Sequence, residues 1–324
     1  MKSSLFTIIG LSVTVAGTAA AQCSSAPIQV RQACKASVDL VSYMTPQLAT
    51  AIAGGSSTLG QSGALGGFGR FAVSIRGTAV INGGIPNVAD KGFNLNDTPQ
   101  LYAVDFRPVP GAGVDAALGL YKGLNLGATH IGAVDLIISA LYLPDVAGEG
   151  GDFSIKAKDG NLKLGYGVRV GLLDETIVTP GLYLSYLQRD LPTVSLVGSS
   201  SGSAGSVGGT LALNDFSVKT TAIRLVAAKN LLIFGMQVGI GQDTYSSSAN
   251  IAATVSGQSA SGNASMSMTR TNLFVGATIN LLVFKLVAEA GQVSGGSMGT
   301  LTNRFDKPAD GPRTYLSGGL RIAF

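Results

Sequence analysis

Apolar and polar residues alternate one by one over many short stretches of this chain. In residues 162–172 an apolar side chain fills every second position, and glycine, lysine or arginine stands between them. Successive side chains of a β-strand point to opposite faces, so the pattern predicts strands with one apolar face. Ten such strands are predicted, at about 70–82, 114–121, 131–143, 162–173, 178–189, 216–228, 231–243, 268–280, 283–293 and 313–324. Weaker alternation at 101–107 and 152–158 allows twelve.

The connections between these strands are short and long in turn. Tight turns are predicted at 173–177, 229–231 and 281–282, with a moderately short one at 123–130. Long polar loops are predicted at 83–112, 144–161, 190–215, 244–265 and 294–312. This alternation is typical of outer-membrane barrels, which have short periplasmic turns and longer extracellular loops.

An internal repeat supports the same interpretation. The segment Asn230–Phe234, N-L-L-I-F, recurs fifty residues later as N-L-L-V-F at Asn280–Phe284. One hairpin with its loop explains such a period, because each unit begins again at a tight turn.

The last predicted strand, 313–324, ends the chain on an aromatic residue. Leu316, Leu320, Ile322 and Phe324 fall on one face of it. This strand closely resembles the C-terminal strand of Gram-negative outer-membrane β-barrel proteins. The resemblance implies that the outer-membrane assembly machinery reads the strand as its signal, carried here by Tyr315, Leu316, Leu320, Ile322 and Phe324.

Composition favours a membrane barrel over a helical membrane protein. Mean hydropathy is +0.36, 12% of residues are charged and 45 are glycine. After the N-terminus no 18-residue stretch is continuously apolar, as a spanning helix would require. We therefore predict an all-β fold, an antiparallel transmembrane β-barrel of ten to twelve strands at residues 69–324, in contact with outer-membrane lipid. The net charge of +4 is too weak to indicate a nucleic-acid partner.

The N-terminus is typical of a secretory signal peptide at residues 1–21. Lys2 is followed by an apolar core at 5–15 and by three alanines before Gln22. Export through an oxidising periplasm makes Cys23 and Cys34 a candidate disulfide, provided that the chain from Cys23 folds back onto the following helix. Two cysteines and one histidine make a metal site improbable.

Residues 22–68 are predicted to form a helical N-terminal segment. Apolar residues recur every three to four positions from Ile28 to about Ile52, with a break or kink at Pro46, and a Gly/Ser-rich connector follows at 54–69. Two placements are open. The helix lies against the periplasmic rim, or it enters the lumen as a plug. The plug has an architectural resemblance to the long-chain fatty acid transporter family, without a shared motif.

Placing the apolar faces toward lipid turns most strand charges toward the lumen. The predicted lumen-lining residues are Arg70, Arg76, Asp135, Lys163, Arg169, Arg224, Arg270, Lys285, Glu289 and Arg321. Arg107, Asp105 and Asp115 complete this set. A cationic lumen would favour anionic solutes. Alternatively, the charges pair with one another inside a narrow, filled barrel.

Catalytic chemistry has little support. Gly198–Gly202 matches G-x-S-x-G only by composition, in a Ser/Gly loop, and His130 is a lone histidine in a predicted turn. We expect neither an enzyme nor a cofactor. The leading hypothesis is passage or binding of small solutes, as a porin-like barrel or a hydrophobic-solute transporter. The alternative is a structural or surface-interaction barrel with a closed lumen. The solute and the oligomeric state are not indicated.

Overall fold

Ten antiparallel strands of the described chain close into a barrel. The computed structural model describes residues 22–55, 63–88, 91–147, 153–202, 206–296 and 305–324; the predicted leader, 1–21, lies outside them. The ring strands are β1 (Phe71–Val80), β4 (Val109–Tyr121), β7 (Ala133–Tyr142), β10 (Leu162–Leu173), β11 (Gly181–Asp190), β13 (Gly209–Leu231), β14 (Phe234–Val255), β15 (Gln258–Leu281), β16 (Phe284–Val293) and β17 (Arg313–Ala323). Pairing of β11 with β13 and of β17 with β1 completes the ring. The predicted antiparallel barrel is confirmed.

The shorter strands lie outside this ring. They are β2 (Gly84–Pro86), β3 (Val104–Phe106), β5 (Leu124–Asn125), β6 (His130–Ile131), β8 (Val146–Ala147), β9 (Phe153–Ala157) and β12 (Val194–Ser200). β2 pairs with β3 and β5 with β6, while β12, β9 and β8 extend the sheet from β13. The weaker strands expected at 101–107 and 152–158 correspond to β3 and β9, so neither enlarges the barrel.

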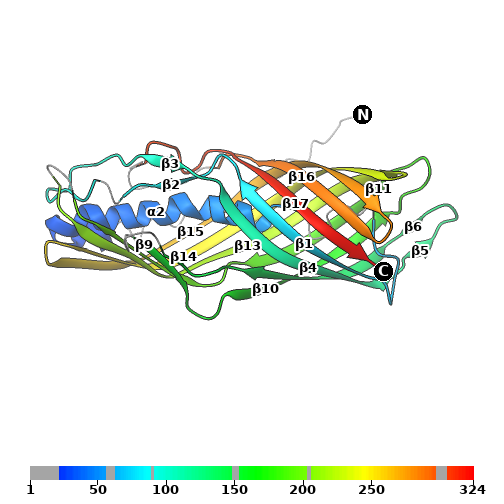
Figure 1. Ribbon diagram of the computed structural model, residues 1–324, viewed down its shortest axis with the longest axis horizontal. Coiled ribbons are helices and arrows are strands. Elements are labelled where there is room, and N and C mark those ends of the chain that lie inside the picture. The colour runs from blue at the N-terminus through cyan, green and yellow to red at the C-terminus, as the bar shows by residue number, and fades with distance from the viewer. Residues whose placement is uncertain (1–21, 56–62, 89–90, 148–152, 203–205, 297–304) are drawn as a thin grey trace, which may run out of the picture.

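The first and last strands meet at one end of the barrel, which we call the terminal end. Phe71 and Phe324 exchange backbone hydrogen bonds of 3.1 and 2.9 Å there, and their rings stack 5.1 Å apart. In Figure 1 the terminal end lies to the right and the opposite, distal end to the left. Outward-facing residues of the ring form a continuous apolar belt, from Phe71, Phe234, Phe284 and Phe324 to Tyr142 and Tyr186. Such a belt is what strands in contact with lipid require.

β14 and β15 continue far beyond this belt. Along β14 the outward residues are apolar up to Ile240 and, except for Ala252, polar from Gln242 onward, whereas the inward residues Ile251, Ala253 and Val255 are buried. The predicted long polar loop at 244–265 is therefore wrong, because this segment is a regular hairpin whose apolar face has switched sides. We call the part of the molecule beyond Asp243 on β14, with the short strands packed around it, the distal head.

Helix α2 (Ile28–Ala53) runs from the distal head into the barrel (Figure 1). It contacts the inner faces of β1, β4, β11, β13, β14, β15 and β17. Thr45 donates a 2.8 Å hydrogen bond to Ser247, and Gln47 accepts one of 2.7 Å from the Gly84 amide. The helix continues through Pro46, so the predicted break is wrong.

The distal start of α2 is fastened by the two cysteines. Residues 22–25 form a helical turn, and Cys23 is joined to Cys34 by a disulfide with Cα atoms 5.5 Å apart. The Asn263 amide donates to Gln22, 2.8 Å away. Within the described residues, no helix combines the length and the apolar character needed to cross a bilayer.

Candidate functional site: the lumen around the end of helix α2

Helix α2 ends in the middle of the barrel, where its last carbonyl groups have no partner within the helix. Gly54 is the C-cap, and Gly55 turns the chain with φ 69°. A Cβ on Gly55 would lie 2.4 Å from the Ser317 hydroxyl and 2.7 Å from Arg76 Cδ. Only glycine fits this turn, because both the backbone angle and the space exclude a side chain.

Three arginines from the barrel wall bind these carbonyl groups. Arg76 Nη1 donates to Gly54 O at 2.8 Å, Arg189 Nη1 donates to Ile52 O and Gly55 O at 3.2 Å each, and Arg224 Nη2 donates to Ala53 O. We call Arg76, Arg189 and Arg224 the arginine clamp. The C-terminus of a helix carries partial negative charge, so three guanidinium groups stabilise it there.

Buried carboxylates hold the arginine clamp in place. Asp115 accepts from Arg189 Nη2 at 2.9 Å and from Arg76 Nε at 3.2 Å, and Asp243 lies 3.4 Å from Arg224. Charges this deep in a protein are tolerated only when they are paired and hydrogen-bonded. The guanidinium groups of the arginine clamp therefore bind both the carbonyl groups of the helix end and the buried carboxylates of the barrel wall.

A chain of polar side chains continues from the clamp toward the terminal end. Asn272 donates to Asp243 at 2.9 Å, and Tyr315 lies 3.3 Å from Asn272 and donates to Glu289 at 3.0 Å. Gln237 links Glu289, at 3.3 Å, to Tyr183, at 3.4 Å. Together these hydrogen bonds link side chains on the inner faces of β14, β15, β16, β17 and β11. They line the lumen below α2 with hydrogen-bonded side chains.

The connector after α2 reaches the same level. Arg169 donates to Asp135, with Nε 2.8 Å from Oδ2, and stacks over the Tyr183 ring at 5.5 Å. The Leu65 amide donates to the same carboxylate at 3.1 Å. Asp135 therefore fastens the returning chain to the wall. Helix and connector occupy successive levels of the lumen.

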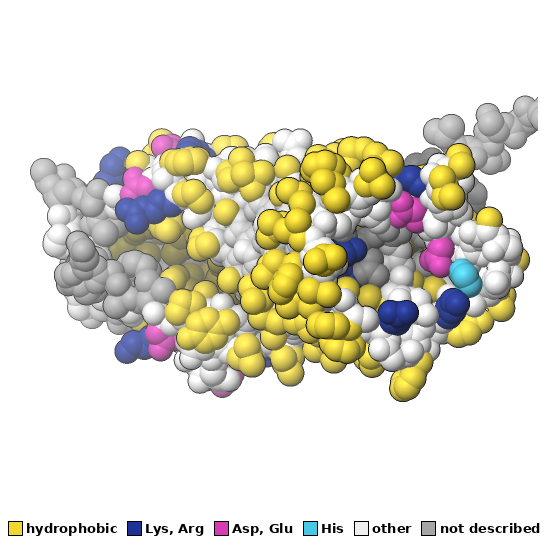
Figure 2. All heavy atoms as spheres, turned by 45° about the vertical axis from the view of Figure 1, so that its right-hand side comes forward, with side chains coloured by type: hydrophobic (Ala, Val, Ile, Leu, Met, Phe, Trp, Pro, Cys, Tyr) yellow, Lys and Arg dark blue, Asp and Glu magenta, His cyan; other side chains and the backbone are white. Residues whose placement is uncertain are grey.

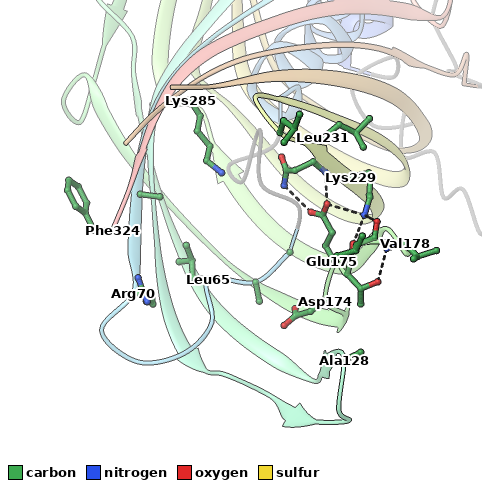
Figure 3. Close-up of a pocket in the computed structure, with 17 residues that line it drawn as sticks. Leu65, Arg70, Ala128, Asp174, Glu175, Val178, Lys229, Leu231, Lys285 and Phe324 are labelled. Carbon is green, nitrogen blue, oxygen red and sulfur yellow. Dashed lines mark hydrogen bonds and ion pairs between the residues drawn. The ribbon is translucent and has the colours of Figure 1, made fainter. Parts of the chain in front are cut away.

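Below this level the terminal end opens into a cavity of about 1300 Å³. Figure 2 shows this mouth as a hollow edged by charged side chains. Lys285 points into it, and Glu175 and Lys229 meet at its wall, 3.5 Å apart (Figure 3). Arg70 lies on the rim and is exposed. The mouth is thus wide, open to solvent and lined by both charged and apolar groups.

The predicted lumen residues lie at different levels of the barrel, with Lys285 at the terminal mouth. Those gathered around the helix end and the polar chain are Arg76, Asp135, Arg169, Arg224 and Glu289, together with Asp115. Arg321 is buried on the same inner wall, directly across from Lys285. Arg270 lies at the base of the distal head, opposite Asp243 on the neighbouring strand, and donates to Gly311 O at 3.1 Å.

Four predicted residues do not line the enclosed lumen. Lys163 is exposed, because it lies at the distal end of β10, beyond the pairing with β11. Arg70 stands at the mouth. Asp105 and Arg107 are exposed in and after β3, outside the ring.

Two charged members of the site, and the uncharged Tyr183, Gln237 and Asn272, were missed from the sequence. Arg189 shares the inward parity of Tyr183 and Leu187, so counting along β11 could have found it. Asp243 lies where the apolar residues of β14 move from the outward to the inward face, so the strand was predicted to end there.

The last strand presents two different faces. Leu316, Leu320 and Phe324 are exposed on the belt and Ile322 is half-buried, whereas Tyr315 is fully buried inside the barrel. Tyr315 therefore belongs to the polar chain of the lumen. Reading of this strand by an assembly machinery stays a prediction.

Comparison with known proteins gives no relative in sequence. No protein-family model matches the chain, and no curated protein gives a significant match. The crystal structure of Neisserial surface protein A is similar over 79% of this chain and 99% of its own, with 8% identity and a TM-score of 0.30. The structure of the toluene transporter TodX of Pseudomonas putida is similar over 78% of this chain and 88% of its own, with 10% identity and a TM-score of 0.33. The structure of Ail from Yersinia pestis is similar over 79% of this chain and 99% of its own, with 12% identity and a TM-score of 0.21.

Likenesses this distant carry no argument about mechanism. The decisive observation is the closed antiparallel ring with its apolar outward belt and polar inner wall, which lipid requires of a spanning β-structure. This chain forms an antiparallel β-barrel with the outer surface of a membrane-spanning one. Among its described residues, no group of three or more histidine, cysteine, aspartate or glutamate side chains is placed to hold a metal ion.

Proposed function

We propose that α2 keeps the lumen of this barrel shut, and that the protein acts at the cell surface through its distal head rather than as an open diffusion pore. The observation that carries this proposal is the arginine clamp. Arg76, Arg189 and Arg224 would be the cations of an anion-selective bore, yet each donates to a carbonyl of the helix end.

The distal head has the character of a surface module. The connections at the terminal end, 122–132, 174–180, 232–233 and 282–283, are shorter than most of those at the distal end, and outer-membrane barrels direct their short turns to the periplasm. The head then faces outward. Its inner face packs on α2 through an apolar cluster that includes Val30, Phe93, Tyr102, Val255 and Phe305. Its outward face on β14 and β15 carries serine, threonine and asparagine, as a water-exposed surface should.

Gated passage of a solute is a second candidate function. It is favoured by the cavity at the terminal mouth. It is also favoured by the fact that, on the helix, the arginine clamp binds backbone carbonyl groups and no side chains. A helix held in this way can leave without unfolding the wall. The binding of small solutes would then require α2 to move.

Single-channel conductance in a planar bilayer tests both candidates. We expect the mature chain, residues 22–324, to be silent, because helix and polar chain fill the bore. A chain that starts at Gly66 serves as the comparison, with resistance to denaturing detergent as the check that it has folded. Conductance only after this truncation would support α2 as the element that closes the lumen, which both candidates require. Stable conductance from the full chain would contradict the proposal.

A further inference from the structure

Three turns at the terminal end are fixed side by side. They are residues 174–180 between β10 and β11, 232–233 between β13 and β14, and 282–283 between β15 and β16. The Asn230 amide donates to Glu175 at 2.7 Å and its side chain donates to the same carboxylate at 2.9 Å. Asn280 donates to Asn230 at 3.3 Å. The repeated asparagines therefore align the three turns into one rim.

The tips of this rim are apolar and extend into the surroundings. Leu232 is 97% exposed, Leu282 102%, Ile177 96% and Val178 86%. We call these four residues, with Ile233 and Val283, the terminal rim. Large apolar side chains at this exposure are unfavourable in water, and here they occur on three adjacent turns.

Backbone conformation adds to this observation. Leu232 and Leu282 have φ values of 55° and 52°, a region that disfavours any residue with a bulky side chain. A two-residue turn at the distal end, between β14 and β15, also begins with a positive φ, 49° at Ser256, and there it carries Ser256 and Gly257. The same chain thus uses small polar residues at one end and leucine at the other. Turn geometry alone does not explain the leucines.

The terminal rim continues a surface that already faces lipid. Leu231 pairs with Phe234 and Leu281 with Phe284, and these exposed residues form the last row of the apolar belt. A strand advances roughly 3.3 Å per residue. The headgroup zone on each side of a bilayer is about 5–7 Å thick. The turn residues therefore fall within that zone.

We propose that the terminal rim is a lipid-contact surface whose leucine and isoleucine tips insert into the headgroup region of the adjacent leaflet. The barrel would then end inside the membrane interface instead of projecting its turns into water. This inference does not depend on whether α2 closes the lumen.

The absence of tryptophan from the sequence makes the test direct. Leu232→Trp and Leu282→Trp are introduced singly into the full mature chain, which is refolded into phosphatidylcholine vesicles. Vesicles brominated near the headgroup end or near the methyl end of the acyl chains report the depth of each indole. We expect blue-shifted emission and strongest quenching by the shallow bromine. Ile233→Trp is a second variant that avoids the positive φ.

Two controls bracket the measurement. Ser256→Trp occupies the matching turn position at the distal end and should emit as an indole in water, without quenching. Val238→Trp lies in the apolar belt and should be quenched best by the deep bromine. If the rim indoles are quenched no more than that of Ser256→Trp, or shift to the blue without quenching, the proposal is overturned. The second result would indicate burial against protein instead of lipid.

Discussion

Two glycines of the barrel wall lie beneath aromatic rings of the neighbouring strand. Gly239 lies opposite Phe274, and Gly291 lies opposite Tyr315. A Cβ at Gly291 would lie 2.4 Å from Tyr315 Cζ, and one at Gly239 would lie 2.2 Å from Phe274 Cζ. The ring of Tyr315 can lie flat against the wall only because no side chain stands there. This position keeps its hydroxyl on Glu289.

Gly291→Ala should therefore destabilise the barrel. The added methyl group displaces the Tyr315 ring, and overpacking of this kind costs about 1–3 kcal/mol. Urea unfolding of the refolded protein, followed by circular dichroism, measures the loss. Gly318→Ala is the matched control, because its nearest neighbour would be Val287 O at 3.8 Å. Equal stabilities of the two variants would contradict the packing argument.

Asp174 gives one residue-level pH dependence outside the spanning strands. Burial raises the pKa of Asp174 above its ordinary value of 3.8, and the nearby His130, 3.6 Å away, only partly offsets this. The folded state then binds the proton more firmly than the unfolded state. Stability from this group rises as pH falls through the raised pKa, and it is fully present below 3.8.

Asp174→Asn should remove this contribution. Unfolding midpoints of the variant and the natural chain, compared from neutral pH down to about pH 4, isolate it from other titrating groups. We expect the natural chain to gain stability relative to the variant as pH falls. An unchanged difference across this range would count against the argument.

At the scale of elements, the alternation of apolar and polar residues was enough to predict the barrel strands, because the lipid-facing positions of a spanning strand must be apolar. Each ring strand has a belt-facing row of apolar residues, so all ten were visible in the sequence. The outer halves of β14 and β15 were not, because beyond Ile240 the apolar row moves to the inner face, where it packs on α2. A pattern defined by lipid contact ends where the lipid ends, although the strand continues.

The position of α2 was also beyond the reach of periodicity. The apolar stripe of α2 predicts that one face of the helix packs against protein, but Gln32, Ser37 and Gln47, outside this stripe, are buried too. Polar residues buried against polar walls resemble solvent-facing ones in a sequence. Their partners, such as Gly84 for Gln47, lie far along the chain.

The arginine clamp predicts a large effect for one carboxylate. Asp115→Asn removes the charge that pairs with both Arg76 and Arg189, and breaking a buried ion pair in this way costs about 3–5 kcal/mol. Urea unfolding measures the change. Asp215→Asn is the control, since Asp215 pairs with Lys158 on the surface and asparagine tolerates its positive φ. A small effect of Asp115→Asn would contradict the role of this carboxylate in holding Arg76 and Arg189 in place.

At the scale of the whole molecule, the barrel, the helix and the distal head form one closed unit. The disulfide of Cys23 with Cys34 fastens the helix at the distal end, the clamp binds it at the centre, and Asp135 fastens the returning connector. The distal head is built on the far half of the helix, so removing α2 would expose the head's apolar cluster as well as open the lumen. Closure and head therefore depend on the same element.

The position of α2 in the lumen is the central claim, and site-directed cross-linking tests it most directly. Thr45 and Ser247 oxygens lie 2.8 Å apart, so Thr45→Cys with Ser247→Cys should form a disulfide in the outer membrane of intact cells, detected by mass spectrometry after proteolysis. Thr45→Cys with Ser246→Cys is the control, because Ser246 faces outward on the same strand. A cross-link is expected only in the first pair, Thr45→Cys with Ser247→Cys. No cross-link in either, or equal yields in both, would contradict it.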